Sequence, residues 1–183
     1  MRVPEESKHL YAALGRVLAC ALALLLNVTG RSQAPNTVKV VKLDRLKQIV
    51  RQNRGRVVVV FFWNTWNVPA IHCHRQVLDG CRKHKSTELV GISVCTDQLN
   101  NEVSASDRET GTLALLQRLR SDFTNLILDE KADVLIDKLI PIGTPCMYVF
   151  DRRGKWHRFS TEEEWPDWSR LEELIVDLLK EKP

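Results

Sequence analysis

The feature that most constrains the fold is a run of seven apolar residues, Val57–Trp63 (VVVVFFW). The run is rich in β-branched and aromatic side chains and shows no polar alternation, which is typical of a strand buried on both faces. A second apolar run, Leu89–Val94, follows after a stretch long enough for one helix. Because parallel strands need a crossover connection, this alternation predicts an α/β fold in which the two strands pair in parallel.

Other segments extend the alternation of strands and helices on both sides of these runs. We expect a helix that Asp44 caps and that ends near Asn53–Gly55, because Leu46, Ile49 and Val50 recur at helical spacing. Residues 96–111 are polar, which indicates a surface loop or a helical insertion. The remaining expected elements are a strand at 38–43, a helix to about His84, helices at 113–119, 132–139 and 168–179, and strands at 126–128, up to Asp151 and at 155–159.

The N-terminal part has a different character. The apolar run at residues 17–28 follows Arg16, and Ser32-Gln33-Ala34 offers a small-residue cleavage site. As a helix this run would span about 18 Å, short of the roughly 30 Å hydrocarbon layer. We therefore predict that residues 1–34 are a signal peptide or an N-terminal anchor and that 35–183 form one domain. The protein would be secreted or periplasmic, and it would contact a membrane only if residues 17–28 stay uncleaved.

The charge of the chain excludes one class of function. A formal net charge of +4 over 183 residues is close to balance. Nucleic-acid binding needs a clustered basic stripe. The nearest candidates, Arg51/Arg54/Arg56 and Arg152/Arg153/Lys155, flank predicted strands, where we expect solvated ends. The sequence therefore indicates no nucleic-acid partner.

Two segments together carry a resemblance to a known family. The first is the buried strand that runs into Trp63-Asn64-Thr65-Trp66-Asn67-Val68-Pro69-Ala70. The second is Gly143-Thr144-Pro145, followed by a strand, Asp151 and Gly154-Lys155. In this order they resemble the thioredoxin-like superfamily, in its TlpA-like extracytoplasmic branch. The resemblance covers about residues 40–180, essentially the whole domain, and implies a three-layer α/β/α sandwich with a mixed central sheet.

The resemblance also implies a site. In this family a cis-proline loop faces the active-site turn, so Thr144-Pro145 would be a cis peptide bond opposite residues Asn67–Ala70. The loop would offer a backbone edge to an extended peptide, and Trp66 would border the site and be partly exposed. An unidentified protein or an extended peptide is therefore the expected partner.

The chain departs from the family where its chemistry is done, because Asn67 and Ala70 stand where the two catalytic cysteines should be. Thiol–disulfide exchange needs a thiolate and a second, resolving thiol. Asn67 supplies neither, but it can cap the following helix. We therefore expect a degenerate loop, Trp66, Asn67, Val68, Pro69 and Ala70, with no catalytic residue, and a non-catalytic binding module.

The remaining cysteines leave an alternative open. Cys146 directly follows Pro145, and Cys73 lies early in the helix after the loop, so a displaced thiol could give a redox protein. A Cys73–Cys146 disulfide would need their Cα atoms to lie within about 7 Å. The competing interpretation is that Cys95 and Cys146 are buried strand residues.

Histidines and cysteines between His72 and His84 also suggest zinc or copper. On one continuous helix, however, residues 72–74 lie two turns from Cys81 and His84, and neighbouring side chains point in different directions. We therefore expect no metal site and no cofactor, with the histidines on a solvated face.

Overall fold

In the computed structural model, residues 37–183 are described apart from 85–86, 98–103, 140–142, 161–167 and 182–183. The predicted leader, residues 1–34, lies outside this part of the chain. The elements in order are β1 (Val38–Val41), α2 (Leu43–Gln52), β2 (Val57–Trp63), α3 (Val68–Lys83), β3 (Leu89–Cys95), α4 (Ala105–Arg118), β4 (Thr124–Leu128), α5 (Ala132–Lys138), β5 (Cys146–Phe150), β6 (Trp156–Ser160) and α6 (Trp168–Lys180). No helix in these ranges is long and apolar enough to cross a membrane.

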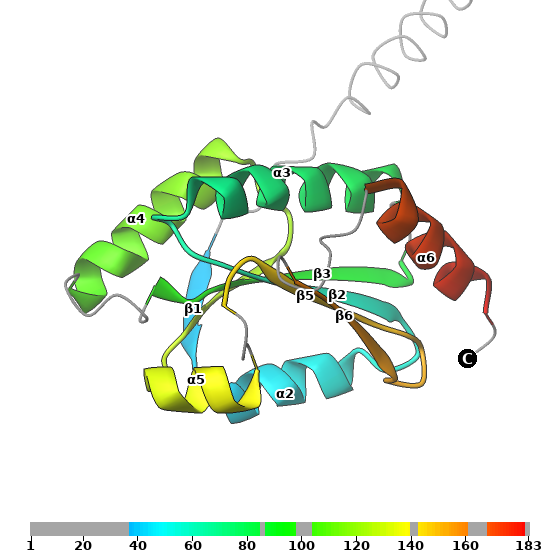
Figure 1. Cartoon of the computed structure of the whole chain (residues 1–183), viewed down its shortest axis with the longest axis horizontal. Helices are drawn as coiled ribbons and strands as arrows, with labels where there is room; N and C mark the ends of the chain where they lie inside the picture. The colour runs from blue at the N-terminus through cyan, green and yellow to red at the C-terminus, as the bar shows by residue number, and fades with distance from the viewer. Residues whose placement is uncertain (1–36, 85–86, 98–103, 140–142, 161–167, 182–183) are drawn as a thin grey trace, which may run out of the picture. The chain divides into compact units, whose positions relative to one another are not determined.

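The strands form one mixed six-stranded sheet in the order β1-β4-β3-β2-β5-β6 (Figure 1). β1, β4, β3 and β2 pair in parallel, whereas β5 pairs antiparallel with both β2 and β6. All seven residues of β2 are buried, which agrees with its uninterrupted apolar sequence. The predicted parallel pairing of β2 with β3 is confirmed, with Val57 opposite Leu89 and Trp63 opposite Cys95.

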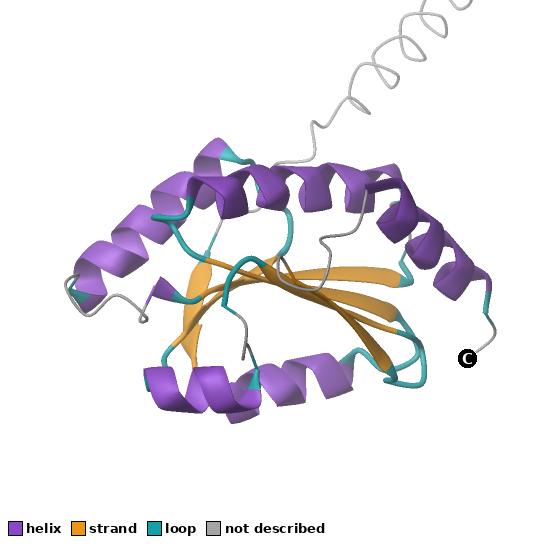
Figure 2. Cartoon of the chain, viewed as in Figure 1, coloured by secondary structure: helices purple, strands orange, loops and turns teal. Residues whose placement is uncertain are grey.

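Helices cover both faces of the sheet, so the predicted three-layer sandwich is confirmed (Figure 2). Helices α3, α4 and α6 lie on one side and α2 and α5 on the other. Successive residues of β2 alternate between the two layers. Val57, Val59, Phe61 and Trp63 pack towards α3 and α6, and Val58, Val60 and Phe62 pack towards α2 and α5.

Two predicted boundaries are wrong for identifiable reasons. Helix α2 begins at Leu43, so Asp44 lies in its first turn and does not cap it. The N–H of Leu43 instead donates to the Glu130 carboxylate at 2.8 Å, a partner from a distant part of the chain. Helix α4 begins at Ala105, where the Ser104 side chain accepts from the Asp107 N–H, so the helix expected at 113–119 starts earlier and the helical alternative for residues 96–111 is confirmed from Ala105 onward. Its first turns are polar and exposed, so they lack the apolar periodicity that marks a helix.

The expectation of a solvated end at Arg152 is also wrong. Its side chain is buried and donates to the Glu88 carboxylate, to the Gly55 carbonyl and to the Leu179 carbonyl at 2.7–3.2 Å. Arg152 thus joins the β5–β6 turn to the start of β2 and the end of α6. In the other basic group, the arginines Arg51, Arg54 and Arg56 are exposed as expected.

Candidate functional site

The turn between β2 and α3 is held by Asn67, which makes two different hydrogen bonds. Its Oδ1 accepts from the Ala70 N–H at 3.2 Å, so Asn67 caps α3 as predicted. Its Nδ2 donates to the Thr144 carbonyl at 3.0 Å. An amide side chain can do both because it carries an acceptor and a donor. Asn67 therefore ties the first turn of α3 to the segment that contains Pro145.

The same segment is held from a second side. The Thr144 hydroxyl donates to Oδ1 of Asn64 at 2.7 Å, and Asn64 is fully buried. The Thr144–Pro145 peptide bond is cis, and the Pro145 side chain is buried. Thr144 thus binds the turn through its hydroxyl and through its carbonyl, so the two segments of the resemblance lie against each other in the fold.

A carboxylate fixes the other side of the turn. Asp97 lies just after β3 and is buried, and its two oxygens accept from the Thr65 N–H at 2.7 Å and from the Thr65 hydroxyl at 2.6 Å. The indole N–H of Trp63 donates to the Ser93 hydroxyl at 2.8 Å. These three bonds join the last residue of β2 and the turn after it to β3 and the residue Asp97 that follows it, where parallel strands bring their carboxyl ends together.

The fixed turn displays apolar side chains to solvent. Trp66 is 55% exposed and Val68 is 73% exposed. Pro69 is also exposed, whereas Ala70 is buried under the first turn of α3. The turn is therefore an apolar projection on a rigid base, and it carries no nucleophile or titratable group.

The structure does not bring Cys73 and Cys146 together. Cys73 packs in the layer of α3, and Cys146 packs with Phe62 on the opposite face of the sheet. Among the described residues, Cys73, Cys81, Cys95 and Cys146 form no disulfide. Cys95 and Cys146 are buried strand residues, as the competing interpretation expected. Cys146 directly follows Pro145 in sequence, but alternate residues of β5 face opposite layers, and Cys146 faces the layer away from α3.

Burial makes the thiols of the α3 layer poor nucleophiles. Desolvation raises the pKa of Cys73, which is half-buried. It raises the pKa of Cys81 to about 12, with a further contribution from Asp122. The pKa of Cys95 also rises to about 12, through burial and the nearby Asp97 carboxylate. A reactive cysteine needs the opposite, an environment that stabilises the thiolate.

The histidines of α3 do not share one solvated face. His72 is exposed, but His74 is fully buried among Trp63, Phe61 and Phe123, with ring centroids 4.7, 5.3 and 6.4 Å away. Neither ring nitrogen of His74 has a hydrogen-bond partner in the described chain. Desolvation, with a smaller effect of Arg82, lowers the pKa of His74 to about 3, so the ring is neutral.

A signal for this burial was present in the sequence. His74 lies four residues after Ala70 and three before Val77, on the same stripe as Cys81, and all four side chains are buried. Because residues at this spacing share one helix face, His74 belongs to the apolar face of α3. His84, at the end of the helix, instead contacts the Glu172 carboxylate at 2.9 Å. The described residues contain no group of three or more His, Cys, Asp or Glu placed to hold a metal.

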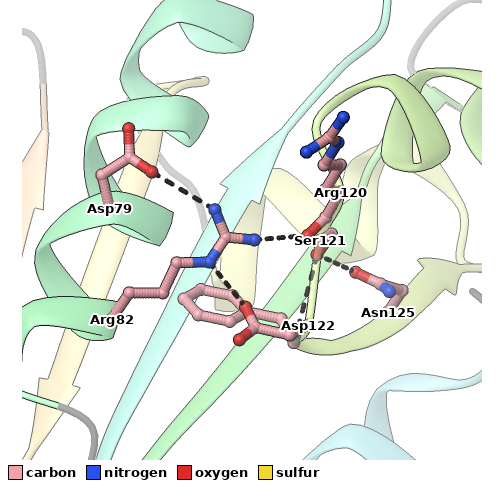
Figure 3. A network of polar contacts seen from close by, with 7 residues as sticks. Asp79, Arg82, Arg120, Ser121, Asp122 and Asn125 are labelled. Atoms are coloured by element: carbon pink, nitrogen blue, oxygen red, sulfur yellow. Dashed lines mark hydrogen bonds and ion pairs between the residues drawn. The ribbon is translucent and has the colours of Figure 1, made fainter. Parts of the chain in front are cut away.

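A network of polar contacts anchors the far end of α3 (Figure 3). The Arg82 guanidinium donates to the Asp79 and Asp122 carboxylates at 3.2 and 3.3 Å and also to the Arg120 carbonyl. Beside it, the Ser121 hydroxyl donates to Oδ1 of Asn125 at 2.8 Å. Helix α3 is thus fixed at its start by Asn67 and at its end by Arg82.

Known proteins resemble this chain in their fold, but not closely in their sequence. No family model and no curated protein matches the sequence. Among solved structures, a thiol-disulfide isomerase from Corynebacterium glutamicum is 17% identical with a TM-score of 0.59, over 72% of this chain and 86% of that one. A secreted Mycobacterium tuberculosis disulfide oxidoreductase, described as homologous to E. coli DsbE, is 12% identical with a TM-score of 0.54, over 69% and 85%. MTB DsbF, in its mixed oxidized and reduced forms, is 13% identical with a TM-score of 0.52, over 70% and 84%.

These similarities agree with the topology of the sheet, and the chain has the thioredoxin-like fold that its two segments predict. At such low identity the similarity concerns the fold alone.

Proposed function

We propose that the chain is a thioredoxin-fold binding module without dithiol catalysis, which holds an extended peptide or a segment of a partner protein at the turn. The observation that carries the proposal is the pair of hydrogen bonds that the Asn67 side chain makes. One side chain caps α3 and binds the Thr144 carbonyl, while its neighbours Trp66 and Val68 stay exposed. The turn thus keeps its position in the fold although it has no thiol.

The site has the properties of a binding surface. Exposed tryptophan is enriched among the residues that dominate protein interfaces, because its large ring buries much apolar area. The turn is held by bonds from Asn64, Asn67 and Thr65 before any partner arrives. Such pre-organisation reduces the entropy lost on binding. An extended segment lying across Trp66 and Val68 would also pass the Thr144–Pro145 loop.

The contacts of the cysteines argue against the alternative of a displaced catalytic thiol. Cys73 and Cys146 face different layers of the sheet, and the pKa of Cys73 is raised by desolvation. A thiolate would therefore be scarce at neutral pH, and no second thiol of this pair could resolve a mixed disulfide.

The proposed place of action is outside the cytoplasm. The predicted leader supports this location, and so does the similarity to a secreted disulfide oxidoreductase. Residues 17–28 would keep the module at a membrane if the leader is retained.

The test is a peptide selection with matched variants. A random library of extended peptides is selected on the wild-type chain, and affinities are then measured for W66S/V68S and for W156S. Trp156 is the control because it is similarly exposed, at 52%, and lies on β6. We expect the selected peptides to bind W156S as they bind the wild type, and W66S/V68S at least about tenfold more weakly, which corresponds to about 1.4 kcal/mol. Equal binding to all three proteins, or failure to select any peptide, would refute the proposal.

A second measurement separates binding from redox chemistry. The native chain is exposed to an alkylating reagent below pH 7, and the modified cysteines are identified by mass. We expect no rapid alkylation in the folded state, since the described thiols are buried or have a raised pKa. Rapid modification of Cys73 or Cys146 would favour the displaced-thiol alternative.

A further inference from the structure

A cavity of about 330 Å³ lies on the side of the sheet that faces α2 and α5. It is separate from the turn at Trp66 and Val68, neither of which lines it. Its size lies at the lower end of the roughly 300–1,000 Å³ that small-molecule sites occupy. The cavity is lined by α2, by the strands β2, β5 and β6, and by the end of α5. Its walls are therefore helices and strands of the sandwich.

The floor of the cavity is aromatic. Tyr148 of β5 contacts Phe62 and Trp156 edge to face, with ring centroids 5.9 and 5.3 Å apart, and lies 6.3 Å from Phe150. The Tyr148 hydroxyl donates to the Leu139 carbonyl, so its polar end is already bonded. Trp156 stays 52% exposed although it packs against this cluster. The floor therefore offers apolar surface to a ligand. It has few polar groups that could form hydrogen bonds to a nucleobase or a sugar.

The rim of the cavity is basic. Four exposed basic residues line it: Arg51 in the last turn of α2, Arg54 and Arg56 in the turn between α2 and β2, and Lys138 of α5. Within the described chain, the structure gives none of these four side chains a hydrogen bond or an ion pair. Lys47 also lines the cavity, one turn before Arg51, and contacts Asp44 at 3.7 Å. Like charges one turn apart destabilise a helix, so an anion at this rim would relieve their repulsion.

The one acidic residue of the lining, Asp151, offsets only one of these positive charges. Asp151 is buried, and its Oδ1 accepts from the backbone N–H groups of Arg153 and Lys155 at 2.9 and 2.8 Å. Its carboxylate is thus used in the β5–β6 turn. The cavity combines an apolar floor with an excess of positive charge at its mouth.

We propose that this cavity binds a small amphiphilic anion, of the class of single-chain carboxylates, with its apolar chain on the aromatic floor and its carboxylate at the Arg51–Arg54–Arg56 rim. Charge complementarity carries the choice of an anion, because guanidinium groups pair with carboxylates in two-pronged geometry. The limited volume favours a small molecule over a protein surface. The inference is independent of the function proposed for the turn.

The test uses the whole chain and four probes: dodecanoate, dodecanol, dodecyltrimethylammonium and inorganic phosphate, all below micelle formation. Binding is followed by calorimetry and by the NMR shift of the Trp156 indole N–H. We expect dodecanoate to bind one site at least about tenfold more tightly than dodecanol or the cationic amphiphile, since a charge-assisted pair adds to the same apolar burial. Phosphate alone should bind weakly, because it leaves the floor empty.

Matched variants locate the site. R51Q/R54Q should weaken dodecanoate binding about tenfold or more, whereas R75Q/R118Q should not. The second pair removes the same charge from exposed positions on α3 and α4, on the other side of the sheet. The proposal is overturned if dodecanol binds as well as dodecanoate, if phosphate alone binds as well, if R51Q/R54Q binds like the wild type, or if no probe binds. Circular dichroism of both variants checks that they are folded.

Discussion

The side chain of Asn67 donates to the backbone carbonyl of Thr144 at 3.0 Å, across 77 positions of the chain. The same side chain accepts from the Ala70 N–H. One residue therefore caps α3 and fixes the cis-proline loop against it. The resemblance places the first catalytic cysteine at this position, where Asn67 makes these two hydrogen bonds.

Replacing Asn67 should separate its two roles. N67A loses the cap and the bond to Thr144, so we expect it to lower the free energy of unfolding by about 2 kcal/mol. N67D keeps a capping oxygen but has no donor for Thr144, so its loss should be smaller, about 1 kcal/mol. Urea unfolding measures both. Q76A, at an exposed position of the same helix, is the control and should change stability by less than about 0.5 kcal/mol. Equal losses for N67A and N67D would contradict this assignment.

Restoring two cysteines should restore dithiol chemistry. In N67C/A70C the first thiol would lie at the N-terminus of α3, where unpaired N–H groups and the helix dipole stabilise a thiolate. We expect the double variant to form a disulfide in air and, once reduced by dithiothreitol, to pass two electrons to an insulin disulfide and return to its own disulfide, while the wild-type chain does neither. The single variant N67C, which has no resolving thiol, is the control. Failure of a folded N67C/A70C to oxidise would mean that the turn no longer has the geometry of a dithiol site.

His74 should make stability depend on pH in acid. Its pKa is about 3 in the folded protein, against 6.5 for an ordinary histidine. Between these values the unfolded chain binds a proton that the folded chain does not, so the free energy of unfolding falls as pH decreases from 6.5 towards 3. Above pH 6.5 the ring is neutral in both states, and His74 causes no loss of stability. The contribution is about 1.4 kcal/mol per pH unit within the window.

The variant H74L tests this linkage, because leucine fills the buried site without titrating. Urea unfolding at several pH values between 4 and 7 should show a smaller slope of stability against pH in H74L than in the wild type. H72Q, at an exposed position of the same helix, should keep the wild-type slope. Parallel curves for H74L and the wild type would show that His74 is not buried as a neutral ring.

Arg152 should matter far more for stability than its neighbour Arg153. Arg152 is buried and bonds Glu88, Gly55 and Leu179, whereas the Arg153 side chain is exposed. R152M removes donors from two backbone carbonyls, and buried acceptors left without partners are destabilising. We expect a clearly lower urea midpoint for R152M and almost none of this effect for R153M. Similar midpoints for the two variants would argue against the observed contacts.

The order of the elements and the two layers could be predicted from short-range patterns. The apolar run Val57–Trp63 became the buried β2, and the apolar stripe of residues 168–179 became the buried face of α6. Asn67 could be identified as a cap because capping joins residues three apart in the chain. Each of these features depends on neighbours in sequence, whose geometry the backbone dictates locally.

Partners that lie far apart in the chain were decided only by the tertiary structure. The Thr144 carbonyl beside Asn67, the Glu130 carboxylate at the start of α2 and the three acceptors around Arg152 depend on strand order and register. So does the separation of Cys73 from Cys146 by the sheet, and so does the basic rim above an aromatic floor. Local periodicity tells which face of an element is apolar, but it does not tell which other element will cover that face.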